Sequence, residues 1–370
     1  ITNNTSPLAA GPGYVARLGA DQTVSFTGAF TSGTVSITPS RTGTIDEKRG
    51  YNLIGNPYLS YLDWNAAYAS ASNMLPTIWY RTVNSSSTMV FDTYNASSGI
   101  GTNNNGSGEV SRYIPPMQAV WVKVVADGNT GAISCTNAMR SHQTGSLKED
   151  VAFPVVRLAV SNGTNSDEAV AVFADQASNG YDKFDSPKMS NNNADIPEIY
   201  MTAGKERVSI NGLESIKGSI EIPVGFNTQK SGDYTIGMSE RSGLENYSIE
   251  LKDMIAGKTI DLSKEKTYSF SAGAGDNASR FNLTLKTNTQ ETSIGLEETA
   301  TIAITTRASS IVVKSQNQAA IVVSDILGRT ISSVNSGSSQ TIIDMPVDGV
   351  YFVEVTSNGT HTTKKVVICK

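Results

Sequence analysis

Cysteine, histidine and charge are all scarce in this 370-residue chain, which has two Cys, two His and 17% charged residues. Catalysis by a His-assisted Ser or Cys needs an imidazole beside the nucleophile. His142 and His361 both lie outside any recognisable catalytic motif, so we expect no catalytic triad and no enzyme. Cys135 and Cys369 are far apart and match no metal–thiolate spacing, so we expect two unpaired thiols.

Long apolar runs and basic clusters are also missing. No segment approaches the roughly 18–20 apolar residues that a membrane-spanning helix needs, so we expect no transmembrane segment. The net charge of -5 is spread along the chain, and no basic stripe with interleaved aromatic residues appears, which argues against nucleic acid as a partner. The chain opens at Ile1 without an initiator Met or a signal peptide, so we expect a trimmed N-terminus or a missing upstream part.

Short β-strands bounded by polar turns fill the chain. The 32 Gly residues and the low charged fraction fit β-rich extracellular proteins better than cytosolic enzymes. Apolar and polar side chains alternate within the strands, as Val208 and Ile210 do with their polar neighbours and as Phe281, Leu283 and Leu285 do with theirs. This pattern predicts an all-β protein with three consecutive antiparallel β-sandwich domains, the last of them Ig-like. We place the first sandwich at 1–148, a jelly-roll-like second sandwich at 149–288, a polar linker at 289–300 and the Ig-like domain at 301–370.

Two parts of the first segment echo each other. A strand at 13–17, a polar turn and a second strand at 23–28 match in order a strand at 119–123, a polar turn and a strand at 131–136. The echo predicts two related hairpins in one sandwich, or the end of a preceding repeat followed by a full one.

Two further local predictions concern the same segment. A Gly/Asn/Ser-rich stretch at 95–108 has little apolar area to bury, so we expect an exposed, mobile connection there. Helix content should be low. The best helix candidate is the Ala-rich segment 64–72, with Asp63 in a position to cap its N-terminus.

The C-terminal segment reads as a run of short strands separated by turn signals. Leu-Gly at 327–328 follows one strand, Asp-Gly at 348–349 precedes another, and Asn-Gly at 358–359 joins the last two. Asn-Gly between β-branched runs is a strong hairpin signal, because a two-residue type I′ turn needs positive φ at both central positions. These signals predict a small, self-contained β-sandwich.

Three motifs follow one another in this segment: Asp-Ile-Leu-Gly-Arg at 325–329, Gly-Val-Tyr-Phe-Val at 349–353 and a Lys-rich final strand at 364–370. In this order and place they resemble the C-terminal sorting domain of the type IX secretion system of Gram-negative bacteria. Cys369 departs from the family pattern, whose tails usually carry another residue there. The resemblance assigns the sorting signal to Asp325, Leu327, Gly328, Arg329, Gly349, Tyr351, Val353, Lys364 and Lys365.

The resemblance implies that the whole chain crosses the outer membrane and is then released or attached to the cell surface. Its partner would be the type IX secretion machinery, which recognises the tail and often removes it. The expected location is therefore secreted or at the cell surface, in association with the outer membrane.

A second resemblance covers the first segment. Residues 50–58 read Gly-Tyr-Asn-Leu-Ile-Gly-Asn-Pro-Tyr and are followed by Asp-Trp at 63–64 and by Ile-Pro-Pro-Met-Gln-Ala-Val-Trp-Val-Lys at 114–123. This combination resembles a module of large secreted proteins from type IX-secreting bacteria. It implies a β-sandwich stalk or adhesin-like module at 1–148, with no defined activity. The strand order of 149–288 resembles the domain that often precedes the sorting tail.

Aromatic side chains indicate where a ligand would bind. All three Trp lie in the first segment, and exposed aromatic rings can stack on sugars. We assign Trp64 and Trp121 to the core, since large aromatic side chains dominate burial. We name Trp79, Tyr80 and Tyr94 as the exposed candidates for carbohydrate binding.

Asp182, Asp185 and Asp276 are the candidate ligands for a structural calcium ion, because hard cations prefer clustered carboxylate and carbonyl oxygens. No EF-hand spacing surrounds them. The alternative is that such Asp side chains form Asx turns with their own backbone. Apart from this calcium ion, we expect no cofactor.

These observations predict a non-enzymatic secreted or cell-surface protein. It would be adhesin-like or structural and would bind a host glycan or an extracellular protein. The alternative is the non-catalytic C-terminal region of a larger secreted peptidase or glycosidase, whose catalytic domain would precede Ile1.

Overall fold

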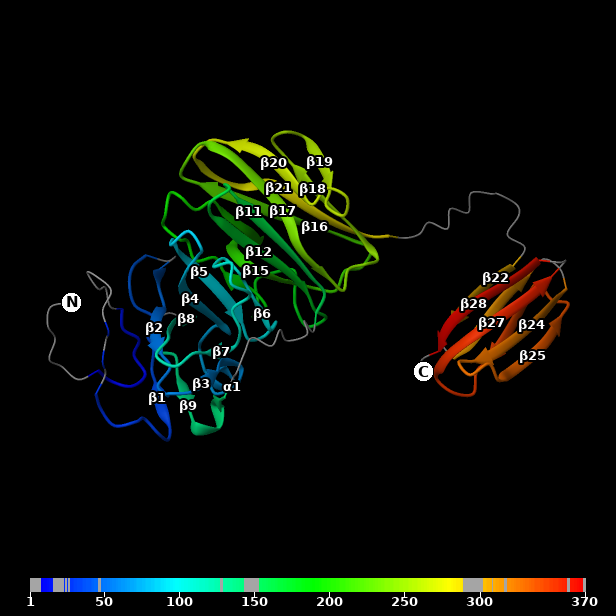
Figure 1. The fold of residues 1–370 in the computed structure, drawn as a ribbon, viewed down its shortest axis with the longest axis horizontal. Helices are drawn as coiled ribbons and strands as arrows, with labels where there is room; N and C mark the ends of the chain where they lie inside the picture. Colours follow the sequence, from blue (N-terminus) through cyan, green and yellow to red (C-terminus); the bar gives the residue numbers. More distant parts are fainter. Residues whose placement is uncertain are drawn as a thin grey trace. The chain divides into compact units, whose positions relative to one another are not determined.

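The structure, a computed structural model, describes residues 8–15, 23, 25, 27–45, 48–126, 129–142, 153–288, 302–307, 309–315, 318–357 and 360–368. Strands make up 55% of it and helices 3%, so the all-β prediction is confirmed. The chain divides into two compact units, Ile1–Asn288 and Thr289–Lys370, which we call unit 1 and unit 2 (Figure 1). The linker predicted at 289–300 lies outside the described residues.

Three small antiparallel sheets form the part of unit 1 up to residue 142. The strand order is β2-β8-β4-β5-β6 in the largest sheet and β10-β3-β7 in the second, and the third pairs β1 with β9. The strands are β1 (Val35–Ile37), β2 (Tyr51–Gly55), β3 (Tyr61–Asp63), β4 (Thr77–Val83), β5 (Met89–Asn95), β6 (Ile100–Gly101), β7 (Tyr113–Ile114), β8 (Ala119–Lys123), β9 (Ile133–Cys135) and β10 (Arg140–Ser141).

The short helix α1 (Trp64–Tyr68) follows β3 and ends before the predicted residue 72. The Asp63 carboxylate accepts two backbone N–H groups of the first turn, which confirms the predicted cap. Trp64 is fully buried, as expected, whereas Trp121 is half-buried. Within the described residues, no helix is long and apolar enough to cross a membrane.

The expected pair of related hairpins is wrong. The strands predicted at 119–123 and 131–136 correspond to β8 and β9, but β8 pairs with β2 and β4 whereas β9 pairs with β1. In the earlier half of the echo, residues 13–15, 23, 25 and 27–28 are not in strands, and the rest lies outside the described residues. Alternation marks a strand but does not select its partner, which depends on tertiary packing.

The part of unit 1 from residue 153 forms one sheet of eleven strands. Ten of them follow one another in the order β19-β18-β21-β16-β14-β15-β12-β11-β17-β20. The eleventh, β13, pairs with β15 outside this order. The strands are β11 (Val155–Ser161), β12 (Ser166–Phe173), β13 (Ser186–Pro187), β14 (Glu198–Ala203), β15 (Glu206–Leu213), β16 (Ser219–Thr228), β17 (Gly232–Ser242), β18 (Tyr247–Asp253), β19 (Lys258–Asp261), β20 (Thr267–Ala272) and β21 (Gly275–Thr287).

This sheet folds over on itself around one apolar core. Phe270 of β20, at the end of the strand order, packs against Phe226 of β16 and Phe281 of β21. The ring centroid of Phe270 lies 5.1 Å from that of Phe226 and 5.0 Å from that of Phe281. The predicted alternation on β21 is confirmed, because Phe281, Leu283 and Leu285 are all buried.

β12 departs from the predicted antiparallel arrangement. It pairs in parallel with β15, where Val170 lies opposite Ile210, so the prediction that every strand pair here is antiparallel is wrong. Nearly all of β12 is buried. One of its faces packs in the folded sheet, and the other packs Val170 and Val172 against Ile100 of β6. A strand covered on both faces loses the polar half of its pattern.

Polar contacts also join the two parts of unit 1, where β5 and β6 lie beside β12 and β15 (Figure 1). The indole Nε1 of Trp79 donates to the carbonyl oxygen of Pro187 at 3.1 Å. The hydroxyl oxygens of Thr77 and Ser186 are 2.9 Å apart. Both parts therefore belong to one compact unit. The boundary placed at 148 stays a prediction, since it falls among residues outside the described ranges.

Most of the stretch 95–108 is not the exposed connection that its composition suggested, although residues 106–108 are exposed. Asn95 and Asn104 are buried within it. The Asn95 Nδ2 donates to the carbonyl oxygen of Asp185 at 3.2 Å, and the backbone N–H of Asn104 donates to the Asp92 carboxylate at 2.6 Å. Buried polar groups are tolerated where they are hydrogen-bonded, so a polar segment can belong to the interior.

Arg157 is the centre of this polar interface. Its guanidinium pairs with Glu168 and Glu240 at 3.0 Å each, and with Glu109 from the other part of unit 1. Its Nη1 also donates to the carbonyl oxygen of Gly101 at 2.9 Å. Arg157 is buried, and a buried charge persists only where it is paired and hydrogen-bonded.

Unit 2 consists of two sheets that share one core. The strand orders are β22-β23-β26 and β25-β24-β27-β28, and the core contains Ile304 and Ile311 from the first sheet with Val353 and Ile368 from the second. The strands are β22 (Ile302–Arg307), β23 (Ser310–Ser315), β24 (Ala319–Asp325), β25 (Thr330–Ser336), β26 (Gln340–Asp344), β27 (Gly349–Ser357) and β28 (Thr360–Ile368).

The predicted terminal hairpin is present in unit 2. β27 and β28 pair antiparallel from Gly349 opposite Ile368 to Ser357 opposite Thr360. The Asn-Gly turn at 358–359 lies outside the described residues. β25 was not expected, because its polar sequence carries little of the apolar alternation that marks the other strands.

Replacing Arg157 with Met should destabilise unit 1 strongly, because three carboxylates lose their common partner. We expect the free energy of unfolding to fall by about 3–5 kcal/mol, as for a buried ion pair that loses one member. Urea denaturation followed by Trp fluorescence measures it, since all three Trp lie in unit 1. The control is Lys264→Met, which breaks an exposed pair with Asp261 and should cost at most about 1 kcal/mol. Equal losses in the two variants would contradict the role of Arg157.

Candidate recognition site in the C-terminal unit

Residues 325–329 form a tight turn between β24 and β25. The backbone N–H of Gly328 donates to the carbonyl oxygen of Asp325 at 3.0 Å. The Asp325 carboxylate accepts the backbone N–H groups of Leu327 at 2.9 Å and Arg329 at 3.0 Å, and the Arg329 Nε at 2.7 Å. Gly328 has a φ of 77°, a conformation that favours glycine. Asp325 and Gly328 therefore fix the shape of the turn.

This fixed turn holds two large apolar side chains in solvent. Ile326 is 69% exposed and Leu327 is 74% exposed. The backbone N–H of Arg329, assisted by its guanidinium, holds the pKa of Asp325 below its ordinary value, so the carboxylate that builds the turn stays charged at neutral pH. Exposed apolar side chains that cluster on a surface mark sites of interaction.

The motif at 349–353 belongs to β27. Tyr351 and Val353 are buried in the core of unit 2. The Tyr351 hydroxyl donates to the carbonyl oxygen of Val347 at 2.8 Å, which fixes the loop before the strand. The side chain of Val347 is exposed. Tyr351 thus positions an apolar group that the sequence motif does not include.

The two lysines of the third motif have different environments on β28. The Lys364 Nζ donates to the carbonyl oxygen of Ile304 at 2.7 Å and so links β28 to β22 in the other sheet. Lys365 is exposed and lies opposite Phe352 of β27. Lys364 therefore has a structural contact, whereas the ammonium of Lys365 faces solvent.

The strand register brings the three motifs to one end of unit 2. Asp325 lies opposite Tyr351, and Gly349 lies opposite Ile368, so the turn, the start of β27 and the end of β28 are neighbours. Five exposed apolar side chains gather on these neighbouring segments, and we call them the turn-end surface: Ile326, Leu327, Val347, Phe352 and Val367.

Of these five side chains, only Leu327 is among the residues assigned to the sorting signal. Phe352 and Val367 could have been found from alternation, because each lies between two buried residues of its strand. Ile326 and Val347 lie in connections, where the sequence carries no comparable signal of exposure.

The prediction that Trp79, Tyr80 and Tyr94 are exposed is wrong. Their exposed fractions are 0%, 6% and 2%. Trp79 is covered where its strand meets the second part of unit 1, and the Tyr94 hydroxyl donates to the Asn65 side chain at 3.0 Å inside the first part. These rings offer no open face on which a sugar could stack.

Asp182 and Asp185 both accept backbone N–H groups, and Asp182 does so in a contact of the Asx type. The Asp182 carboxylate accepts the backbone N–H of Phe184 at 2.7 Å. The Asp185 carboxylate accepts the backbone N–H groups of Asp182 at 2.7 Å and Gly212 at 3.0 Å. Asp182 thus follows the Asx alternative to calcium binding, whereas Asp185 holds the loop before β13 against β15.

Asp276 lies on β21 with other partners. Its carboxylate accepts the Tyr200 hydroxyl at 2.6 Å and pairs with the Arg207 guanidinium at 2.5 Å. Across the described ranges, no group of three or more His, Cys, Asp or Glu side chains is placed to hold a metal ion. The three Asp side chains named for calcium therefore do not form such a group.

The cysteine prediction is confirmed where it falls on described residues. Cys135 is buried and free, and burial raises the pKa of its thiol to about 11. A thiol that stays protonated at neutral pH is a poor nucleophile. Cys369 lies outside the described residues.

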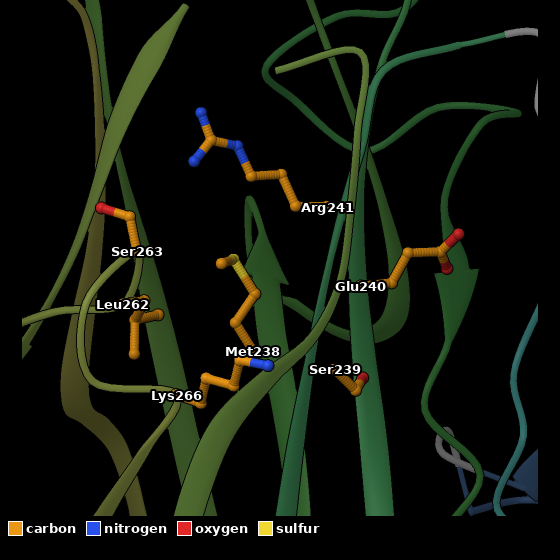
Figure 2. A pocket seen from close by; sticks show the side chains of 7 residues that line it. All are labelled: Met238, Ser239, Glu240, Arg241, Leu262, Ser263 and Lys266. Atoms are coloured by element: carbon orange, nitrogen blue, oxygen red, sulfur yellow. The ribbon is translucent and has the colours of Figure 1, made fainter. Parts of the chain in front are cut away.

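A pocket of 360 Å³ lies between β17 and the segment after β19 (Figure 2). Glu240 and Arg241 point to opposite sides of the strand in this view. Glu240 is bound to Arg157, and the Arg241 guanidinium donates to the carbonyl oxygens of Leu244 and Tyr247 at 3.0 and 2.9 Å. These charged groups already serve structural contacts, so the pocket presents no catalytic arrangement of them.

Two family models match the chain. One, described as "Domain of unknown function (DUF8693)", covers residues 1–285, which is nearly all of unit 1. The chain belongs to this family. The other, described as "Secretion system C-terminal sorting domain", covers residues 299–369. Unit 2 of this DUF8693 protein is therefore a type IX C-terminal sorting domain, which makes the protein a secreted, cell-surface protein and the secretion machinery its partner.

Comparison with other known proteins adds little about this DUF8693 protein. No curated protein matches it. Seven chains of known structure match, one of them described as "Biofilm associated protein - BSP domain". That structure shares 9% sequence identity over 92% of this chain and 66% of its own length, with a TM-score of 0.17. This score is too low for the likeness to support a conclusion about fold or function.

Replacing Asp325 with Ala should loosen the turn at 325–329, because the carboxylate bonds to the Leu327 and Arg329 amides are lost. We expect faster hydrogen exchange at these two amides in the full chain, measured by mass spectrometry. The control is Ile326→Ala, which changes an exposed side chain and no carboxylate contact. Unchanged exchange in the Asp325 variant would contradict the proposed rigidity of the turn.

Asp185 should make the stability of unit 1 depend on pH. Burial raises the pKa of its carboxyl from 3.8 to about 7, so between these values the folded protein holds a proton that the unfolded chain has released. The free energy of unfolding should therefore fall as the pH rises from about 4 to 7. Asp185→Asn should reduce this slope in urea titrations at several pH values, whereas exposed Asp195→Asn should keep it. An unchanged slope in the Asp185 variant would argue against the raised pKa.

Proposed function

We propose that unit 1 is a non-enzymatic, adhesin-like or structural module that unit 2 delivers to the outside of the outer membrane. The proposal rests on the sorting domain, which indicates where the protein is located, and on the interior of unit 1. Inside it, Arg157 pairs with Glu109 across the two β-rich parts and is also held by Glu168 and Glu240 of its own part. A β-structure whose two parts are joined by buried polar contacts suits a module displayed outside the cell. Its ligand would be an extracellular protein or a glycan.

The finer fold assignment belongs to the same proposal. The described residues of unit 2 form seven strands, in sheets of three and four around one core, which is the strand number of an Ig constant-type sandwich. In unit 1 the eleven-stranded sheet that folds over on itself corresponds to the jelly-roll-like sandwich. The first sandwich corresponds to the three smaller sheets.

The turn-end surface carries the proposal about sorting. Five apolar side chains are exposed at one end of unit 2, beside the Asp325 turn and the exposed Lys365. Holding such side chains in water costs hydration free energy and adds nothing to the core. We assign this surface to the contact with the secretion machinery, which would cover the apolar side chains.

Leu327→Asp should reduce cell-surface display without unfolding the protein, because it places a charge on the turn-end surface. Surface labelling and cell fractionation in a type IX-secreting host measure display. The matched control is Ile342→Asp, which alters an exposed apolar residue of β26 in the other sheet.

Deleting residues 300–370 should leave unit 1 folded but retained in the periplasm.

Equal display of both Asp variants would contradict the assignment of the turn-end surface. Normal display of the deletion would contradict the sorting role itself. The gene sequence upstream of Ile1 separates the adhesin-like module from the C-terminal region of a larger secreted peptidase or glycosidase, since a catalytic domain encoded there would favour the second.

A further inference from the structure

Lys188 and Asp167 form a buried pair inside unit 1. The side chain of Lys188 is 7% exposed and that of Asp167 is 0% exposed. The Lys188 Nζ lies 2.5 Å from each of the two Asp167 carboxylate oxygens. Asp167 belongs to β12, and Lys188 directly follows β13. The amine is thus held in contact with both oxygens of the carboxyl group by two separate elements of the sheet.

The surroundings shift the Asp167 carboxyl group toward its neutral form. Burial, and to a lesser extent the negative charge of Glu198, raise the pKa of Asp167 to about 6, although Lys188 acts against this rise. The Asp167 Oδ2 also accepts the backbone N–H of Ile199 at 2.8 Å, which fixes the carboxyl group in place. Glu198 is itself buried and is held by the backbone N–H of Asn191 at 2.6 Å.

We propose that Lys188 and Asp167 join in an intramolecular isopeptide bond. One proton moves from the ammonium to the carboxylate, which gives an amine and a carboxylic acid. The Nζ lone pair then attacks the Asp167 Cγ, a Cγ–O bond breaks, and the oxygen leaves as water with two hydrogens from the original ammonium and none from solvent. The product is a secondary amide, and the step needs no oxidant, cofactor or second protein.

Proximity makes this condensation feasible although amide formation in water is unfavourable. Holding two reactants in contact can supply the equivalent of about 7–11 kcal/mol. A buried ion pair also carries a desolvation penalty for both charges. Conversion of the pair into a neutral amide removes these charges from the interior and releases one water molecule, so burial itself favours the product.

The bond would reinforce the interface between the two parts of unit 1. Lys188 follows Pro187, whose carbonyl oxygen accepts the Trp79 indole N–H. A covalent link from Lys188 to β12 therefore ties the segment that contacts the first part to the centre of the large sheet. A cross-link of this kind restricts the unfolded chain, as a disulfide does, and the free Cys135 supplies no such link.

Intact mass spectrometry of the purified full chain tests the proposal directly. We expect a mass lower by one water than the sequence requires. Trypsin cuts after Lys and Arg, but it should not cut after the modified Lys188. The digest should therefore contain a branched species in which peptide 158–183, with Asp167, is joined to peptide 184–205, with Lys188.

Two variants make the test specific. Lys188→Arg keeps the positive charge but lacks the amine, so its mass should equal the full sequence mass. Lys230→Arg is the matched control, because Lys230 also contacts a carboxylate, that of Asp195, but both side chains are 59% exposed. It should retain the loss of water. An unmodified wild-type mass with normal cleavage after Lys188 would overturn the proposal and leave an ordinary buried ion pair.

Discussion

The need to pair the charged groups buried between its two parts governs the structure of unit 1. Its two parts meet through charged and polar side chains, which are residue types seldom buried in proteins. Arg157 lies at this interface and is paired with carboxylates from both parts. A buried charge without partners would cost several kcal/mol. Removing the partners that either part supplies would therefore strongly destabilise unit 1. This constraint explains why two segments that look like separate sandwiches form one compact unit.

Unit 2 follows the opposite rule at one of its ends. There the polar groups of Asp325 and Tyr351 are used to position loops, and apolar side chains are left in water. In the type IX sorting domain, the recognisable motif therefore describes mainly the scaffold. Most of the exposed side chains that this scaffold presents are not among the residues assigned to the sorting signal, and they are the groups available to a partner.

The sequence was most informative where the relevant contacts are local. Alternation located strands such as β21, and Asp63 identified its helix cap. The failures share a cause in contacts between distant residues. Trp79 has the same local pattern whether it faces solvent or Pro187, and the polar stretch 95–108 finds partners such as Asp185 that are remote in sequence. The parallel pairing of β12 with β15 likewise has no local signal.

Native-state hydrogen exchange over a range of urea concentrations tests most directly whether unit 1 is one cooperative structure. If it is, the most protected amides of β4 and β5 should open at the same free energy as those of β11 and β12, because Arg157 of β11 and Trp79 of β4 both make buried contacts from one part of unit 1 to the other. Separate opening free energies for the two parts, with β4 and β5 unfolding while β11 and β12 stay protected, would contradict this account.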